Sequence, residues 1–178
     1  MKKILIVKNH LDIGGIQRSL VNLLDEIHAQ YEITLLLFAD GRNYKKNLEK
    51  EIPSDVKIVR VKSDYKTLGY SQREAKNLLE KLWRGAHVIA TRLFGFQFVT
   101  RIMALTQKKI SGYDVVISFM QSSRDQIFYS GCNEFVQYCT KSSKKITFLH
   151  GDFILDNSAT EKVKALYRKF DLVAACSE

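Results

Sequence analysis

The sequence contains little cysteine and little proline. It has three cysteines, Cys132, Cys139 and Cys176, and a single proline, Pro53. The cysteine number is odd and no pair has Cys-x-x-Cys spacing, which argues against a disulfide framework and against a structural zinc site. We therefore expect a reducing, cytoplasmic setting in which these cysteines behave as small apolar residues.

Long hydrophobic runs are also missing. No stretch approaches the roughly 18 uninterrupted apolar residues that a membrane-spanning helix needs. After Lys2 and Lys3 only four apolar residues precede Lys8, a run too short for a secretory signal. We expect neither a spanning segment nor a secretory leader.

Several enzyme motifs are absent. The chain has neither the Gly-x-Gly-x-x-Gly of dinucleotide-binding folds nor the glycine-rich Lys-Ser/Thr loop of P-loop proteins. It has no Gly-x-Ser-x-Gly motif for a serine nucleophile. It also lacks an Asp-x-Asp pair, which argues against a Mg²⁺ or Mn²⁺ nucleotide-sugar site within this chain. We expect no metal and no other cofactor.

The chain is instead rich in basic residues, with 28 Lys and Arg against 19 Asp and Glu and a net charge of +9. Such a charge attracts phosphorylated substrates, acidic lipid or nucleic acid, although it also suits an ordinary solvated surface. The charges are dispersed, and the largest cluster lies within 141–145. Because no RNA-recognition or helix-turn-helix pattern accompanies them, we expect no nucleic-acid partner.

The start of the chain predicts a ligand-binding element. An apolar strand over 3–7 leads into a polar loop that Gly14 and Gly15 close, and an amphipathic helix follows. Glycines at a helix N-terminus expose backbone N–H groups, which together with the helix dipole favour an anion such as a phosphate. The alternative is that the glycine pair only allows close packing of helix and strand.

Strands alternate with helices along the rest of the chain. Strands are expected at 3–7, 32–38, 56–61, 113–119, 145–149 and 171–175, and helices after Gly15, after a capping box at 71–74, over 86–109, over 125–139 and after a capping box at 158–161. This alternation is typical of βαβ units. We predict one α/β domain over 1–178, a Rossmann-like parallel sheet flanked by helices.

Three polar segments follow strand ends, at 9–15, 119–124 and 150–152. Ligands bind outside the carboxyl ends of the strands in such sheets, so these segments face one cleft if the strand order permits. His150 could bind a sugar or phosphate or transfer a proton, and Asp152 could accept hydroxyl hydrogen bonds. A structural role for His150 is the alternative.

Arg18 and the 86–109 stretch can each be interpreted as functional or as purely structural. Arg18, with Gln17, could reach the cleft from the first helix or could be solvated. The 86–109 stretch combines aromatic and aliphatic residues with flanking arginines and lysines. It predicts either a pair of core helices or a surface that docks on anionic lipid.

Some of these motifs resemble a known family. Gly14-Gly15-Ile16-Gln17-Arg18, followed by the strand at 32–35, is similar to the start of group 1 (family four) glycosyltransferases of the GT-B fold, which typically carry Gly-Gly-x-Glu-Arg there. The segment 148–153 resembles their aromatic/aliphatic-His-x-Asp segment, and 171–178 resembles the Ser-Glu-terminated strand that closes their N-terminal domain.

The resemblance implies a metal-independent, retaining transfer of a sugar from a nucleotide-sugar to a saccharide or lipid-linked acceptor. Gly14, Gly15 and Arg18 would bind the donor phosphate or acceptor, together with Asp152, and His150 would be catalytic. Gln17 replaces the family's usual Glu, so an acidic role at this position is not implied. We expect an acceptor-side half of the GT-B fold that lacks the nucleotide-sugar-binding domain.

The expected partners are therefore a nucleotide-sugar, an acceptor and an anionic membrane surface, with the chain cytoplasmic or peripheral on the inner membrane face. A second interpretation is a stand-alone Rossmann-like module that binds a phosphorylated ligand or a partner subunit without catalysis.

Overall fold

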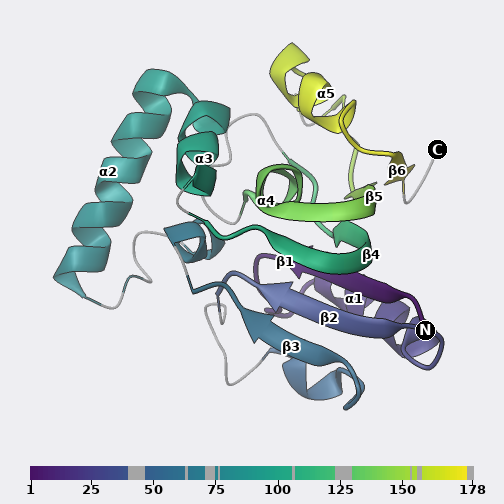
Figure 1. The fold of residues 1–178 in the computed structure, drawn as a ribbon. Helices are drawn as coiled ribbons and strands as arrows, with labels where there is room; N and C mark the ends of the chain where they lie inside the picture. The colour runs from purple at the N-terminus through teal and green to yellow at the C-terminus, as the bar shows by residue number, and fades with distance from the viewer. Residues whose placement is uncertain are drawn as a thin grey trace.

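The computed structural model describes residues 1–39, 47–62, 64–70, 75, 77–105, 107–122, 130–152, 154–155 and 158–175. These residues form a sheet with helices on both faces (Figure 1). The predicted α/β class is confirmed. None of the helices in these ranges combines the length and apolar composition that a membrane crossing requires.

The sheet has six strands in the order β3-β2-β1-β4-β5-β6, and every neighbouring pair is parallel. The strands are β1 (Lys3–Lys8), β2 (Glu32–Leu37), β3 (Lys57–Arg60), β4 (Ile110–Ser118), β5 (Thr140–Leu149) and β6 (Leu172–Ala175). β1 and β2 are buried at all positions after the first, because helices cover both faces of the sheet.

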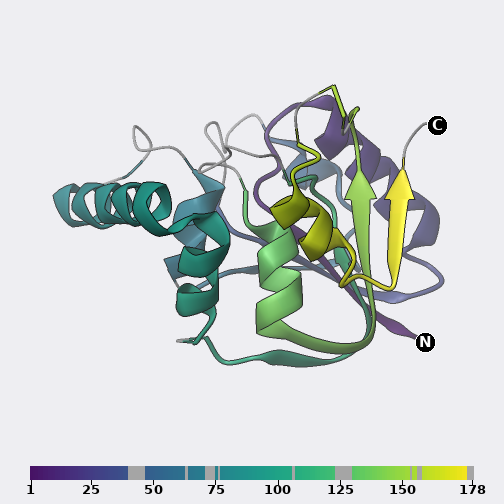
Figure 2. The same cartoon turned by 90° about the horizontal axis from the view of Figure 1, so that it is seen from above.

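The helices divide between the two faces. They are α1 (Gly15–Ile27), the 3-10 turns η2 (Leu48–Glu51) and η3 (Asp64–Gly69), α2 (Leu78–Phe94), α3 (Phe96–Leu105), α4 (Cys132–Cys139) and α5 (Glu161–Tyr167). Leu20 and Leu24 of α1 pack on one face of the sheet. α3, α4 and α5 lie on the other face (Figures 1 and 2). Their side chains, among them Met103, Phe135 and Leu166, belong to the core on that face.

The strand order places a topological switch point between β1 and β4. From β1 the chain moves outward to β2 and β3, then returns to β4 on the opposite side of β1. Connections from the two central strands thus leave in opposite directions, and in sheets of this kind ligands bind at such a point, outside the carboxyl ends of the strands. The loops that follow Lys8 and Ser118 begin at this point.

Helices are expected after the capping box at 71–74 and over 86–109, and the structure divides this region differently, since α2 joins the first to part of the second. α2 begins at Leu78, where the Asn77 side chain accepts a hydrogen bond from the Glu80 N–H at 2.8 Å. It ends at Phe94, because the next residue, Gly95, has a φ of 86° and interrupts the helix before α3. Sequence periodicity did not reveal this break, because apolar residues continue on both sides of Gly95.

Other boundaries also move. β4 and β5 begin at Ile110 and Thr140, earlier than expected, and α5 is capped by Thr160 instead of by Ser158. The Thr160 hydroxyl accepts from the Val163 N–H, so the predicted capping box does not begin the helix at Ser158, which is fully buried two residues earlier. The capping box at 71–74 and Cys176 lie outside the described residues, and so does the predicted start of the 125–139 helix.

Two glycines with similar backbones provide a matched stability test. Gly112 and Gly131 have φ of 91° and 88°, but a Cβ on Gly112 meets open space, whereas one on Gly131 would lie 2.6 Å from Leu68 Cδ1. Gly112→Ala should cost about 1–2 kcal/mol through backbone strain alone. Gly131→Ala should cost roughly 1–3 kcal/mol more, because buried Leu68 must move. Urea unfolding measures both, and equal losses would show that the Leu68 contact is easily relieved.

Candidate functional site

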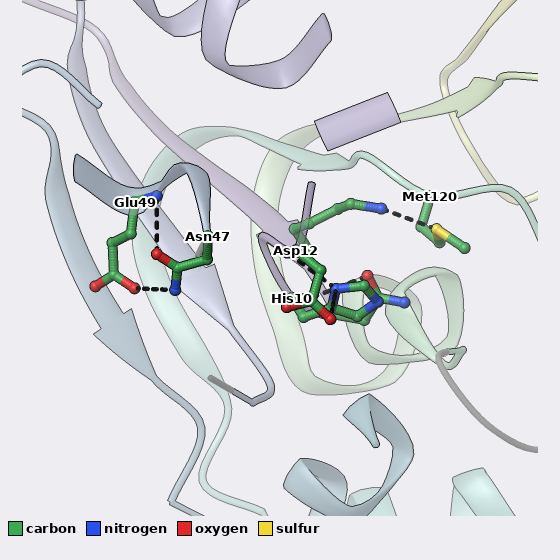
Figure 3. Close-up of polar contacts among 7 residues, drawn as sticks. His10, Asp12, Asn47, Glu49 and Met120 are labelled. Carbon is green, nitrogen blue, oxygen red and sulfur yellow. Dashed lines mark hydrogen bonds and ion pairs between the residues drawn. The ribbon is translucent and has the colours of Figure 1, made fainter. Parts of the chain in front are cut away.

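A buried lysine marks the carboxyl end of the central strand. Lys8 is the last residue of β1 and its side chain is fully buried. Its ammonium donates a hydrogen bond to the Met120 sulfur at 3.0 Å, and Met120 follows β4 across the switch point (Figure 3). A thioether is a weak acceptor, so this contact compensates little of the hydration that the ammonium has lost.

Burial lowers the pKa of Lys8 from 10.5 to about 8, and the Cys132 thiol opposes this shift. Lys8 is therefore a mostly protonated cation near neutral pH at the point where the fold favours ligand binding. The same burial raises the pKa of Cys132, at the start of α4, to about 12, so Cys132 is a neutral thiol. The result is a fixed positive charge below the loops of the switch point.

The loop after β1 is held by polar contacts (Figure 3). The Asp12 N–H donates to His10 Nδ1 at 3.2 Å, and the Asp12 carboxylate lies 3.4 Å from the same nitrogen. Asp12 also forms an isolated antiparallel bridge with Asn47, whose side chain caps η2 by accepting from the Glu49 N–H. The segment before the glycine pair is thus tied to the segment after β2.

Gly14 and Gly15 occupy the start of α1, as predicted. Gly14 is the N-cap, with an extended backbone and no capping side chain. A Cβ on Gly14 would lie 2.7 Å from Gln17 Oε1, whereas a Cβ on Gly15 would have no neighbour within 4 Å. The space beside Gly15 is therefore open, and Gln17 lies against Gly14. A ligand could approach closely beside Gly15, whereas beside Gly14 the Gln17 side chain would have to move first.

Arg18 takes part in a surface ion pair. Its guanidinium binds the Glu51 carboxylate of η2 with both terminal nitrogens, and both side chains are half exposed. The pairing raises the pKa of Arg18 and lowers that of Glu51 through their hydrogen bond. Arg18 thus ties α1 to η2 in this structure. A ligand would compete with Glu51 for the guanidinium.

His150 lies directly after β5, on the same edge of the sheet as Lys8. The Gln121 side-chain oxygen accepts from the N–H groups of His150 and Gly151 at 2.9 and 3.0 Å, which links this loop to the one after β4. The imidazole stacks on Phe148 at a centroid distance of 5.8 Å and lies 4.7 Å from the Phe119 ring. These contacts fix the orientation of the ring.

The environment keeps the His150 imidazole neutral. Burial lowers its pKa to about 4, the positive charge of Lys8 acts in the same direction, and a hydrogen bond with the Phe119 backbone opposes them. A histidine with this pKa is a poor general acid near neutral pH. It can still donate or accept a hydrogen bond toward a polar substrate.

Asp152 stabilises the turn that follows. Its Oδ1 accepts hydrogen bonds from the N–H groups of Ile154 and Leu155 at 2.9 and 2.8 Å. The side chain is exposed and close to His150 in sequence. This geometry assigns Asp152 a turn-capping role, and nothing in it brings the carboxylate toward Lys8 or the glycine pair.

A buried polar network supports the loop after β4. The Tyr167 hydroxyl of α5 accepts from the Ser122 N–H at 2.9 Å, and Asn133 Nδ2 donates to Ser122 Oγ at 2.8 Å. Thr147 of β5 donates to Asn133 Oδ1 at 2.7 Å. A network of this kind holds the loop in one position because each member is satisfied by another. Ser123 and Arg124, also considered from the sequence, lie outside the described residues.

Sequence reasoning missed Lys8, Gln121 and Asn133. The sequence did contain an indication for Lys8, because it directly follows the apolar residues of the first strand and so either continues this buried strand or begins the loop after it. Gln121 lies in the polar segment predicted at 119–124, but neither it nor Asn133 could be singled out, because their partners are distant in sequence. Among the described residues no three His, Cys, Asp or Glu side chains gather in a way that could hold a metal ion.

The carboxyl edge therefore combines a buried cation, an open helix N-terminus and a neutral imidazole. The first two favour an anionic group and the third favours hydroxyl or carbonyl groups. The geometry provides binding and electrostatic stabilisation, without a nucleophile among these groups.

No protein-family model matches the chain, and no curated protein matches it at a significant level.

Lys8→Met should stabilise the protein by an amount that depends on pH. The folded-state pKa of about 8 lies below the unfolded value of 10.5, so the unfolded chain holds the proton more tightly. The free-energy cost of burying the protonated Lys8 ammonium is fully present below about pH 8. It decreases as pH rises to 10.5 and is absent above that pH. The pH-dependent part is about 3 kcal/mol.

Denaturant unfolding of wild type and Lys8→Met between neutral and alkaline pH measures this difference. Lys57→Met, which removes an exposed lysine at the opposite end of the sheet, is the control and should show no such dependence. A wild-type and Lys8→Met difference that stays constant with pH would mean that Lys8 has an ordinary pKa.

Proposed function

We propose that this chain is the acceptor-side domain of a metal-independent, retaining glycosyltransferase that moves a sugar from a nucleotide-sugar to a saccharide or lipid-linked acceptor in surface polysaccharide synthesis. One observation carries the proposal. Two segments resemble group 1 glycosyltransferases: 14–18 follows β1, and 148–153 begins with the last two residues of β5. The carboxyl ends of these strands lie on one edge of a parallel sheet beside the switch point.

The charge at this edge supports an anionic substrate. Lys8 supplies a desolvated cation, and α1 begins at Gly15 without a capping side chain, where helix geometry leaves the first backbone N–H groups without partners inside the helix. Attraction between a buried cation and a diphosphate is stronger than the same attraction in water, because the local dielectric is low. A nucleoside diphosphate or a phosphorylated acceptor fits both features.

In this proposal His150 binds the sugar as a neutral group. Its ring is held by Phe119 and Phe148 and its backbone by Gln121. A preorganised neutral imidazole can stabilise charge that develops on the reacting sugar without changing its own protonation. Asp152 supports this loop through its turn, and Arg18 would bind phosphate only after leaving Glu51.

Binding of a nucleoside diphosphate tests the anionic part of the proposal. Calorimetry with uridine and guanosine diphosphates should detect binding to the wild-type chain. Lys8→Met should weaken binding about tenfold, which corresponds to about 1.4 kcal/mol. Gly15→Val should weaken it through its side chain, with the fold retained because the space beside Gly15 is open.

Lys57→Met is the matched control and should bind as wild type does. Because Lys8→Met is expected to be more stable than wild type, weaker binding by this variant cannot come from unfolding. Equal binding by Lys8→Met, Gly15→Val and wild type would place any ligand elsewhere.

Transfer assays test the catalytic part of the proposal. The chain alone, given a nucleotide-sugar and a lipid-linked saccharide, should show negligible turnover, and activity should require a nucleotide-sugar-binding domain. In that complete enzyme His150→Ala should lower kcat by about 10²-fold, the usual scale for one electrostatic group. The pH profile of the wild type should show no ionisation of His150 near neutrality, because its pKa is about 4.

Turnover by the chain alone would contradict the proposal that activity requires a separate nucleotide-sugar-binding domain. Binding of a diphosphate without transfer in any combination would favour the stand-alone binding module. An unchanged kcat in His150→Ala would make His150 a structural residue.

A further inference from the structure

Helix α2 presents its apolar side to solvent. Arg84, fully buried, and His87 are the buried residues of its 17 positions. Leu82, Ile89 and Leu93 are 62%, 60% and 71% exposed, and their spacing of seven and then four residues places them along one side of the helix. A helix on the surface of a globular protein normally has the opposite arrangement, with its apolar stripe toward the core.

Polar contacts fix this orientation. His87 Nδ1 lies 3.3 Å from the Thr67 hydroxyl of η3, and Lys66 of η3 forms an ion pair with Glu80 at 3.3 Å. The Trp83 ring lies 5.1 Å from the His87 ring, on the exposed side of it. Turning the apolar stripe inward would break these contacts and would expose Arg84.

Helix α3 extends the apolar side. Phe98, Ile102 and Leu105 are exposed at spacings of four and three residues, whereas Val99 and Met103 face the core. The Phe94 and Phe98 rings lie 5.8 Å apart, so the two stripes join across Gly95. We call the exposed apolar residues of α2 and α3 the α2–α3 apolar surface. α2 lies at the periphery of the molecule in both views (Figures 1 and 2).

The charge around this surface is mainly basic, and Glu80, the acidic residue of α2, is paired with Lys66. Residues 81–113 contain no Asp or Glu. The basic residues of this segment are Lys81, Arg84, Arg92, Arg101, Lys108 and Lys109. All except Arg84 are exposed. An apolar stripe with exposed basic flanks is typical of a helix that lies in the interface of an anionic bilayer.

We propose that the α2–α3 apolar surface docks on an anionic lipid bilayer, with Leu82, Ile89 and Leu93 in the acyl boundary and the basic residues at the headgroups. A second copy of the chain fits this surface less well. Pairing it with itself would bring basic segments together with no acidic residue from either 81–113 segment between them, and like charges disfavour such an interface.

The inference deepens the proposed function by naming where a lipid-linked acceptor would be met, and it rests on that function only for the acceptor. Docking itself requires no sugar, no diphosphate and no turnover. Vesicle binding and diphosphate binding therefore test separate surfaces, and either can fail without the other.

The single tryptophan makes the test direct. Trp83 is half exposed on this surface, so its fluorescence should shift to the blue when lipid covers it. Sedimentation with phosphatidylcholine vesicles containing phosphatidylglycerol should show binding at least tenfold tighter than to phosphatidylcholine alone. The binding should weaken as salt is raised, because counterions screen the attraction.

Two variants and their controls locate the binding. Leu82→Ser with Leu93→Ser should reduce vesicle binding at least tenfold, and so should Lys81→Glu with Arg92→Glu. The apolar control is Ile154→Ser with Leu155→Ser, a pair 76% and 79% exposed outside this surface. The charge control is Lys57→Glu with Lys162→Glu, two exposed lysines on other elements. Both controls should bind as wild type does.

Absence of vesicle binding and of a Trp83 shift at low salt would overturn the proposal. Equal loss of binding in the variants and their controls would also overturn it, because the attraction would then be distributed over the whole molecule. Concentration-dependent dimers in sedimentation velocity that Leu82→Ser with Leu93→Ser abolishes, without vesicle binding, would identify a second copy as the occupant.

Discussion

The parallel pairing of β1 with β4 is the constraint on which the rest of the structure depends. Ile4 to Val7 pair with Val115 to Ser118, so both strands end at the same edge although more than a hundred residues separate them. Because β2 and β3 lie on one side of this pair and β5 on the other, the connections diverge there. The loops that follow Lys8 and Ser118 thus meet at a position that no neighbouring strand covers.

Lys8 shows how this edge differs from an ordinary core. A buried ammonium whose acceptor is the Met120 thioether lowers stability, since a group of similar shape without charge would avoid the desolvation. Burial lowers the pKa of the neighbouring His150, and the same cation adds to this effect, so the imidazole is neutral. Stability is thus lower at the position where an anionic ligand would be held, which is the usual relation between a functional group and its fold.

Helix α2 also departs from the usual distribution of polar and apolar side chains, because its apolar side chains are exposed and Arg84 and His87 are buried. The burial of Lys8 and the exposure of the apolar residues of α2 have the same cause, since the packing of a whole strand or helix decides where each of its side chains lies. Contacts of η3 with Glu80 and His87 decide how α2 is rotated, and the apolar stripe follows from that rotation. A membrane interface relieves exposed apolar area in the same way that burial does.

The sequence by itself determined the α/β class, the approximate strands and the position of Gly14 and Gly15 at the first helix, because apolar periodicity and glycine pairs act over a few residues. It also indicated that 86–109 would be a helical segment with an apolar, basic surface as one interpretation. Only the tertiary structure decided the strand order, the burial of Lys8, the link from Gln121 to His150 and the rotation of α2. These depend on contacts between residues far apart in the chain, and no local pattern records which of two faces such a contact will cover.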